Sequence, residues 1–534
     1  MTATVLLVAA VLSGVSAVVW TTYYTFQPLW VEHAAYGLQA NVHFHDALMR
    51  DGLWGALASA TSNGRHTLQP ALLAIVWPPL LSVPYSHLFV AGGALCVFLL
   101  LLARYVRERT GSVALAIGSV VLCAALPGLY DERNGLGAPW PDYQAMFFLG
   151  SATVAFALFA VSARVGWLAL AGTCASLAAL ARDTATIYAA ITCGPIVVLL
   201  SVREFRHHRS AASAIRLILW CGIPALPAIL LLVHRATFLN AYYLSANMWQ
   251  LRQPFSDSIQ NIWQLFSEFA GYLPLIVIAV LAAGALTTRR RDWTLADTVV
   301  IYAPVSFLML LLANGYTSDV TKEVMYLAPG LVCAAVTLRG GIDLRHPALR
   351  TIAAVALTVC VVAAGQTAMA AYDRARHPEL DALELRASQH ALARALGKLP
   401  RTVGWQSYSA YDWGSVVSTL AFYEFGRFQP PTGPPFFNRK NYWDAWFPGL
   451  ALADLQRRFA EGVDRQVDVA IVLKEPDRRP EHMEEYSFSI ASYIASHVQA
   501  SPAWRYLTVV ETSVSGPLAL YVNARRIDLA QLEH

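Results

Sequence analysis

Charged residues are scarce in this 534-residue chain: Asp, Glu, Lys and Arg make up 14% of it, against 56% hydrophobic residues. Soluble domains carry about a quarter charged residues, so this scarcity excludes an ordinary soluble protein. CxxC spacing is absent, and all seven cysteines lie within apolar runs, where they act as small hydrophobes. Cysteine-based metal sites and a disulfide in the polar tail are therefore not indicated. The net charge of +4 gives no indication of nucleic-acid binding.

Long apolar runs are what the chain has instead. Runs of about 17–23 residues recur up to about residue 371, and that length crosses a hydrocarbon core of about 30 Å. We therefore predict a polytopic α-helical membrane protein over 1–372, with about eleven membrane helices. The predicted spans are about 3–21, 87–103, 112–128, 144–163, 165–181, 185–202, 215–233, 269–286, 296–313, 324–338 and 350–371. The run 68–85 is also apolar, but its prolines disfavour a straight span, so we assign it to a half-buried juxtamembrane segment.

Residues 373–534 are ordinary in polarity and predict a separate soluble domain. Predicted strands at 402–406, 467–473, 506–511 and 518–522 alternate with helical stretches at 373–400, 412–424, 449–461 and 484–499. This alternation is typical of a small α/β domain. The domain has no glycine-rich phosphate loop, no Ser-His-Asp pattern and no metal signature.

Basic residues divide the loops into two sets. The short loops of one set hold Arg104, Arg107, Arg109, Arg164, Arg203, Arg206, Arg209, Arg216, Arg289, Arg290, Arg291, Arg339, Arg345 and Arg350. The longer loops of the other set hold only Arg50, Arg65, Arg133, Arg182, Arg235, Arg252 and Lys322. The positive-inside rule then predicts a cytoplasmic N-terminus, with the first loop (22–86) and the tail on the non-cytoplasmic side. The arginine- and alanine-rich composition fits a bacterial inner membrane, so we expect the tail to be periplasmic.

Most of the candidate functional side chains lie in the polar segment 22–67, between the first two predicted spans. Its acids are Glu32, Asp46 and Asp51, and His43, His45 and Asp46 form a compact H-x-H-D cluster. A strand would place the two histidines on one side, whereas a helix would separate them by about 200°. Two interpretations stay open: a divalent metal held by imidazole and carboxylate ligands, or interfacial histidines hydrogen-bonded within the loop.

Several short motifs follow one another along the chain. They are Glu32-His33-Ala34-Ala35-Tyr36, a proline-rich stretch (Gln69–Leu81), Trp140-Pro141-Asp142, Ala181-Arg182-Asp183-Thr184 and Lys322-Glu323 followed by Tyr326-Leu327-Ala328-Pro329. In this order they resemble the motifs of the GT-C membrane glycosyltransferases, which include the protein O-mannosyltransferases and the aminoarabinose transferases. The resemblance covers the organisation of 1–372. It departs at the opening motif, where Glu32 stands for an Asp and His33 for the second acid.

The resemblance implies an enzyme that transfers a sugar from a polyprenyl-phosphate carrier to a lipid, polysaccharide or protein acceptor on the non-cytoplasmic face. It implies Glu32 and Asp142 as the catalytic acids, Glu32 as the base and Asp142 in a positioning or sugar-binding role. The substrate- and phosphate-binding residues that it implies are His33, Tyr36, Arg182, Asp183, Lys322 and Tyr326. No cofactor follows from it, and the use of a divalent metal stays open.

Each of these residues also has a plainer interpretation. Glu32 can be a solvated loop acid, and Asp142 can cap the fourth helix. Arg182 can pair with Asp183 or with Asp142, because ionisable groups beside apolar runs are usually paired or functional. Lys322 can snorkel at a helix end. At the level of the whole chain, a polytopic transporter or flippase, an O-antigen-ligase-like enzyme and a non-catalytic assembly protein are the alternative functions; a transporter would require mid-bilayer charges and internal repeats, which the apolar runs lack.

Overall fold

The computed structural model describes residues 2–24, 38–63, 67–83, 85–130, 135–138, 141–243, 294–314, 380–400, 403–409, 413–425, 447–481 and 483–527, with single positions within 256–264, 351–373 and 432–444. The chain divides into two compact units. The first comprises 1–26, 51–76 and 85–376, and the second comprises 27–50, 77–84 and 377–534. The sequence predicted a single division at 372/373, whereas two pieces of the first loop group with the C-terminal residues.

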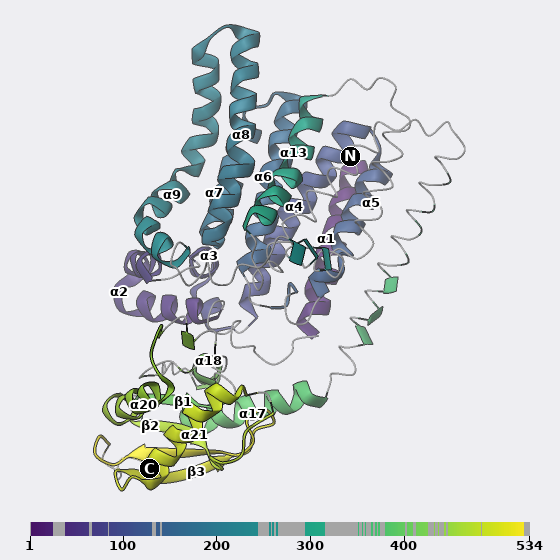
Figure 1. Ribbon diagram of the computed structural model, residues 1–534. Coiled ribbons are helices and arrows are strands. Elements are labelled where there is room, and N and C mark those ends of the chain that lie inside the picture. The colour runs from purple at the N-terminus through teal and green to yellow at the C-terminus, as the bar shows by residue number, and fades with distance from the viewer. Residues whose placement is uncertain are drawn as a thin grey trace. The chain divides into compact units, whose positions relative to one another are not determined.

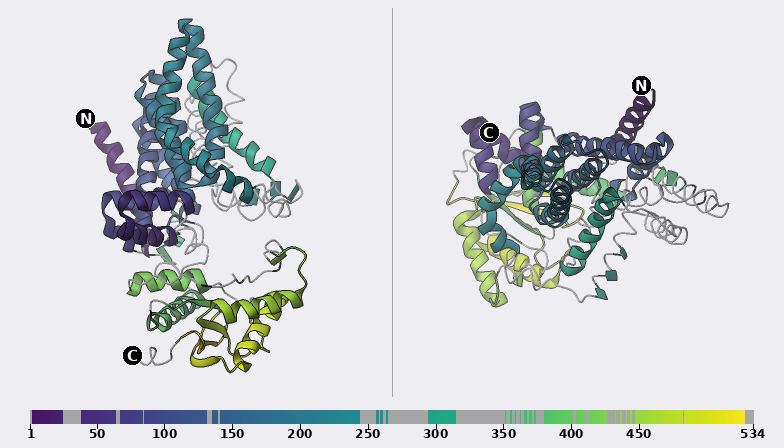
Figure 2. Two further views of the ribbon diagram at one scale, coloured as in Figure 1. Left: turned by 90° about the vertical axis from the view of Figure 1, so that its left-hand side faces the viewer. Right: turned by 90° about the horizontal axis from the view of Figure 1, so that it is seen from above.

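The first unit is built from apolar helices, including some that are seen nearly end-on in the view from above (Figure 2). They are α1 (Thr2–Tyr24), α4 (Ser86–Thr110), α5 (Val113–Ala124), α6 (Pro141–Ser162), α7 (Gly166–Ala181), α8 (Asp183–His208), α9 (Ala211–Tyr243) and α13 (Leu295–Asn314). α4, α6, α8 and α9 contain apolar stretches long enough to cross a membrane, and the other four contain shorter ones. The protein is therefore an integral, multi-pass membrane protein. The predicted spans 269–286 and 324–338 lie outside the described residues, and 350–371 is described only at single positions.

The apolar run 68–85 is not a single span. Its first part forms α3 (Leu68–Val76), and a short 3-10 helix, η2 (Pro78–Ser82), follows after a break at Trp77. Trp77 is extended (φ −165°, ψ 104°), as the residue before a proline usually is. The Thr67 hydroxyl donates to the Leu180 carbonyl at 3.3 Å, which ties the start of α3 to the end of α7. The prediction that prolines interrupt this run is confirmed.

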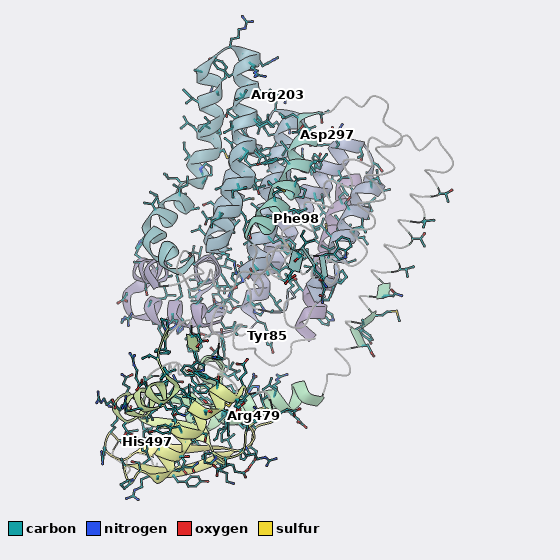
Figure 3. All side chains as sticks on the ribbon, in the orientation of Figure 1. Tyr85, Phe98, Arg203, Asp297, Arg479 and His497 are labelled. Atoms are coloured by element: carbon teal, nitrogen blue, oxygen red, sulfur yellow. The ribbon has the colours of Figure 1, made fainter. Side chains whose placement is uncertain are left out.

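The helices of the first unit start and finish at two opposite ends of the bundle (Figure 1). At one end α4 and α8 finish and α9 begins, with Arg107, Arg109, Arg206 and Arg209 nearby. We call this the arginine-rich end; α1 starts there too, because Arg107 Nη1 donates to Thr4 Oγ1 at 3.2 Å. α4, α6 and α8 start at the opposite end, which we call the Asp142 end. Figure 3 labels Arg203 and Asp297 at the first end, Tyr85 at the other and Phe98 between them.

Close packing sets the arrangement of these helices. α6 is buried over almost its whole length, and its Phe147 ring stacks on Phe98 of α4 at 5.9 Å between ring centroids. α7 and α9 approach most closely at Gly172, where an added Cβ would lie 2.1 Å from the Cys221 carbonyl oxygen. A small residue is therefore required at this crossing, as is common between membrane helices.

The second unit contains a four-stranded mixed sheet in the order β1-β2-β4-β3. Its elements are α17 (Leu380–Gly397), β1 (Trp405–Tyr408), α18 (Trp413–Phe425), α20 (Leu452–Gln466), β2 (Val469–Leu473), α21 (Glu485–Ala500), β3 (Trp504–Val510) and β4 (Leu518–Asn523). β1 and β2 are parallel, and the other neighbouring pairs are antiparallel. Trp443 lies in its core, with its ring edge-on to Phe459 at 5.0 Å and its Nε1 donating to Ser487 Oγ at 3.0 Å. The predicted α/β alternation is confirmed, with element ends shifted by a few residues.

The boundary between the two units falls within helix α2 (Gln39–Asn63), between residues 50 and 51. The helix is kinked nearby, at Gly52 (φ 70°, ψ −176°). Its first half belongs to the second unit, where the His45 ring lies edge-on to Phe422 of α18 at 5.4 Å. Gln39 Nε2 also reaches Ser418 Oγ, at 3.5 Å. The H-x-H-D cluster is thus helical, so His43 and His45 point about 200° apart rather than to one side.

Candidate functional site

Asp142 and Arg182 reach the same end of the bundle because α6 starts there and α7 ends there. Pro141 opens α6, a position that suits proline because the first helical N–H needs no partner, and Asp142 follows in the first turn. An acid in that turn is stabilised by the helix dipole. α7 ends because Arg182 turns extended (φ −149°, ψ 132°), and α8 begins at the next residue.

The two side chains form a buried ion pair. Arg182 Nη1 donates to Asp142 Oδ2 at 2.5 Å, and the side chains are 12% and 0% exposed, respectively. Of the two partners that the sequence allowed for Arg182, the structure brings Asp142 to it. A carboxylate this far from water is costly unless its oxygens are compensated, so its remaining interactions decide what it does.

Among the described residues, the two oxygens of the Asp142 carboxylate differ, because Arg182 reaches only Oδ2. Oδ1 is buried, and no hydrogen-bond donor reaches it among the residues that the structure describes. A buried oxygen left without a donor costs about 1–3 kcal/mol. Such an oxygen accepts a hydrogen bond from any hydroxyl or N–H group that is brought to it.

Three further hydrogen bonds hold the start of α6 in place. Gln144 Nε2 donates to Gln69 Oε1 of α3 at 2.6 Å, and Tyr143 Oη donates to the Gly128 carbonyl at 2.5 Å. On α4, His87 Nε2 donates to the Gly137 carbonyl at 2.8 Å, which fixes the loop before α6. Sequence reasoning did not single out Tyr143, Gln144 or His87, and the available signal was weak: each is a polar side chain at the end of an apolar run.

A second buried ion pair lies at the arginine-rich end. Arg109 of α4 donates three hydrogen bonds to Asp297 of α13. Its Nε and Nη2 donate to Oδ1 at 3.3 and 3.1 Å, and Nη2 also donates to Oδ2 at 2.9 Å. Thr294 donates to Asp297 Oδ2 through its N–H at 3.0 Å and its hydroxyl at 2.8 Å. The Asp297 N–H bonds back to Thr294 Oγ1 at 3.3 Å, which completes a reciprocal helix cap. This pair was also missed from the sequence.

The other predicted site residues divide into two groups. Glu32, His33, Tyr36, Lys322 and Tyr326 lie outside the described residues, as does the side chain of Asp183, whose backbone starts α8. Of the predicted set, the described part of the chain therefore brings together Asp142 and Arg182.

The H-x-H-D cluster does not make a metal site by itself. His43 and His45 are on different faces of α2, and Asp46 Oδ1 lies 3.7 Å from His45 Nδ1. Within the described ranges, no group of three or more His, Cys, Asp or Glu side chains is placed to hold a metal ion.

Comparison with known proteins gives a likeness to solved structures. No protein-family model matches the chain, and no curated protein matches it. It is similar to the oligosaccharyltransferase AglB of Archaeoglobus fulgidus in complex with an inhibitory peptide and a dolichol-phosphate (14% identity over 97% of this chain and 75% of that one, TM-score 0.47). The A. fulgidus oligosaccharyltransferase with Zn and sulfate gives 13% identity, coverages of 98% and 74% and a TM-score of 0.48. The apo form of that enzyme gives 12% identity, coverages of 96% of this chain and 74% of that one, and a TM-score of 0.47.

Proposed function

We propose that this protein is a GT-C-type glycosyltransferase that moves a sugar from a polyprenyl-phosphate donor to an envelope acceptor. The observation that carries the proposal is the buried Asp142 carboxylate, with one oxygen on Arg182 and the other open among the described residues. It lies at the end of the bundle opposite the arginine-rich loops. By the positive-inside rule that end is non-cytoplasmic, which in a bacterial inner membrane is the periplasmic side.

The transfer breaks the bond between the sugar's anomeric carbon and the carrier phosphate, and forms a bond to an acceptor hydroxyl oxygen. The acceptor proton passes to a carboxylate, for which we propose Glu32. Asp142 Oδ1 accepts a hydrogen bond from a hydroxyl of the sugar or the acceptor, and so positions it. The departing phosphate carries the negative charge and needs cationic donors around it.

Arg182 and Lys322 are the proposed phosphate ligands. A guanidinium presents several N–H donors in a rigid fork, so Arg182 can hold Asp142 and a phosphate oxygen in one geometry. The resemblance adds His33, Tyr36, Asp183 and Tyr326 as residues that line the substrate. The acceptor class, whether glycolipid, polysaccharide or protein, is left to experiment.

The placement of charge supports this proposal over a transporter or flippase. In α4, α6, α7 and α13 of the first unit, the buried ionisable pairs Asp142–Arg182 and Asp297–Arg109 lie at helix ends. A transporter that moves a charged solute places such groups near the middle of the bilayer. An O-antigen-ligase-like reaction differs in its donor, which would be a diphosphate-linked oligosaccharide.

A transfer assay tests the proposal. Protein in nanodiscs is incubated with a panel of radiolabelled polyprenyl-phosphate sugars and one polyprenyl-diphosphate oligosaccharide, with and without a chelator. We expect transfer by the unsubstituted protein from a monophosphate donor, and its loss in Glu32→Ala and Asp142→Asn. The matched control is Asp297→Asn, which removes the buried carboxylate at the arginine-rich end. Full activity in both site variants would overturn the proposal, and so would a reporter fused after His534 that is active in the cytosol.

A further inference from the structure

The kink in α2 forms an exposed apolar corner in the first unit. Asp51, Gly52, Leu53 and Trp54 are exposed one after another, and the Trp54 side chain is 82% exposed. Successive residues of a straight helix turn by about 100°, so a helix packed along one face cannot expose four in a row. The kink at Gly52 lies within this exposed run, directly before Leu53 and Trp54.

Two glycines make this corner possible. Gly52 has φ 70° and ψ −176°, a conformation that is essentially restricted to glycine. At Gly55 an added Cβ would lie 2.3 Å from the Asp51 Cβ. The segment Asp51-Gly52-Leu53-Trp54-Gly55 thus combines a backbone built to bend with two large apolar side chains at the bend.

A second exposed apolar surface of the same unit lies on α3. Ile75 is 64% exposed and Val76 is also exposed, although α3 is too short to be a span. The Thr67–Leu180 hydrogen bond ties α3 to the end of α7, so this surface lies at the Asp142 end. The spanning helices of this unit also expose large apolar side chains, such as Val198 of α8, as helices that face lipid do.

We propose that the Leu53–Trp54 corner of α2 inserts into the headgroup region of the lipid bilayer at the Asp142 end. The unit that carries the corner also carries the spanning helices, and α2 ends at Asn63, shortly before α3, which is tied to the end of α7. A tryptophan next to charged residues suits this depth, because its ring is apolar and its indole N–H reaches polar headgroups. The corner then holds the polar first loop at the height of the headgroups, where a lipid-linked phosphate also lies.

Depth-dependent quenching tests this surface. Trp54→Cys and Leu53→Cys are labelled with the fluorophore NBD in vesicles that contain lipids with a doxyl quencher at carbon 5 or carbon 12, with iodide as the aqueous quencher. Val198→Cys, mid-way along α8, is the hydrocarbon reference. Arg457→Cys, exposed on α20, is the water reference. The unsubstituted protein, labelled in parallel, gives the background from the native cysteines.

The expected result is stronger quenching of both corner labels by the carbon-5 lipid than by the carbon-12 lipid, with iodide quenching at least about fivefold below that at position 457. Asp46→Cys is the matched control, because it is exposed on the same helix before the kink. A label there should respond to iodide and not to lipid. The proposal is overturned if the corner labels behave like position 457, or if position 46 shows the same lipid quenching, since the dye alone would then explain it.

Discussion

Two buried aspartates of the first unit each pair with an arginine from another helix, and they differ in how their oxygens are used. Asp297 receives donors on both oxygens, from Arg109 and from Thr294. Asp142 receives Arg182 on Oδ2, and Oδ1 has no donor among the described residues. Both lie in the first turn of a helix and both are fully buried. Among the described residues, therefore, both oxygens of Asp297 have donors and one oxygen of Asp142 has one.

This difference separates a structural ion pair from a candidate functional one. Removing a carboxylate from water costs several kcal/mol, and a bidentate arginine with a helix cap offsets that cost for Asp297. In the described part of the chain, Asp142 is compensated by one arginine contact and the helix N-terminus, and its Oδ1 has no donor there. Positions that serve function are often less than optimal for stability. Substitution by asparagine should therefore mainly lower activity at Asp142 and mainly lower stability at Asp297.

The largest effect is expected for Asp142→Asn on activity. The amide keeps the shape of the side chain but removes the negative charge that faces Arg182. It also replaces one acceptor oxygen with an NH2 group, which only donates. We expect sugar transfer to fall by about 10²–10³-fold, the usual cost of removing one positioned charge-stabilising group. The measurement is the transfer rate per folded protein in nanodiscs, with melting in detergent as the control for folding. Transfer within threefold of the unsubstituted rate would remove Asp142 from the site.

The same substitution at the other end should mainly affect stability. Asp297→Asn leaves the Arg109 guanidinium facing a neutral group and weakens the cap of α13. Breaking a buried pair costs about 3–5 kcal/mol, so we expect a clear drop in melting temperature, larger than for Asp142→Asn. Transfer per folded protein should change less than threefold. If Asp142→Asn is the more destabilising of the two, the distinction between the pairs fails.

The architecture was largely predictable because it depends on local patterns. The apolar runs, the prolines of 68–85 and the arginine-rich loops act over a few residues each, and the described helices follow them. The strands of the tail were found for the same reason, since short β-branched runs alternate there with helical stretches. The assignment of 38–50 to the second unit was not predictable, because it depends on contacts such as His45 with Phe422, far along the chain.

The sites were less predictable for the same physical reason. Asp142 was found from its Pro-Asp motif, but its pairing with Arg182 depends on α6 and α7 ending side by side. Thr294-Leu295-Ala296-Asp297 carries the signature of a helix cap, yet its partner Arg109 is 188 residues away in sequence. The H-x-H-D cluster was ambiguous because its meaning depends on whether the segment is strand or helix. Glu32 and Lys322 stay predictions, since they lie outside the described residues.

Arginine-to-lysine substitutions sharpen the comparison at the cationic partners. Arg109 uses Nε and Nη2 together, and lysine cannot reproduce that fork, so Arg109→Lys should lower the melting temperature by about 4 °C or more. Arg182 uses Nη1 on one Asp142 oxygen, a contact that an ammonium can also make, so Arg182→Lys should lower the melting temperature less than Arg109→Lys does. Its transfer rate should fall by about tenfold if the fork also holds a phosphate. Equal melting shifts in the two variants would contradict the difference in geometry.

The smallest effect is expected for Thr294→Ala, which removes the cap and keeps the Arg109–Asp297 contact. Losing an N-cap hydroxyl typically costs about 1 kcal/mol. Asp297 Oδ2 also loses the Thr294 hydroxyl as a donor, so the cost should exceed that of Ser112→Ala, a cap of α5 that accepts from the Leu115 N–H alone. Melting temperatures of the two variants, and of each combined with Arg109→Lys, measure the coupling. Thr294→Ala should be non-additive with Arg109→Lys, since both act on one carboxylate, whereas Ser112→Ala should add to it independently. Additivity in both combinations would mean that the cap and the arginine stabilise α13 separately. The full set of donors on Asp297 would then not be what distinguishes it from Asp142.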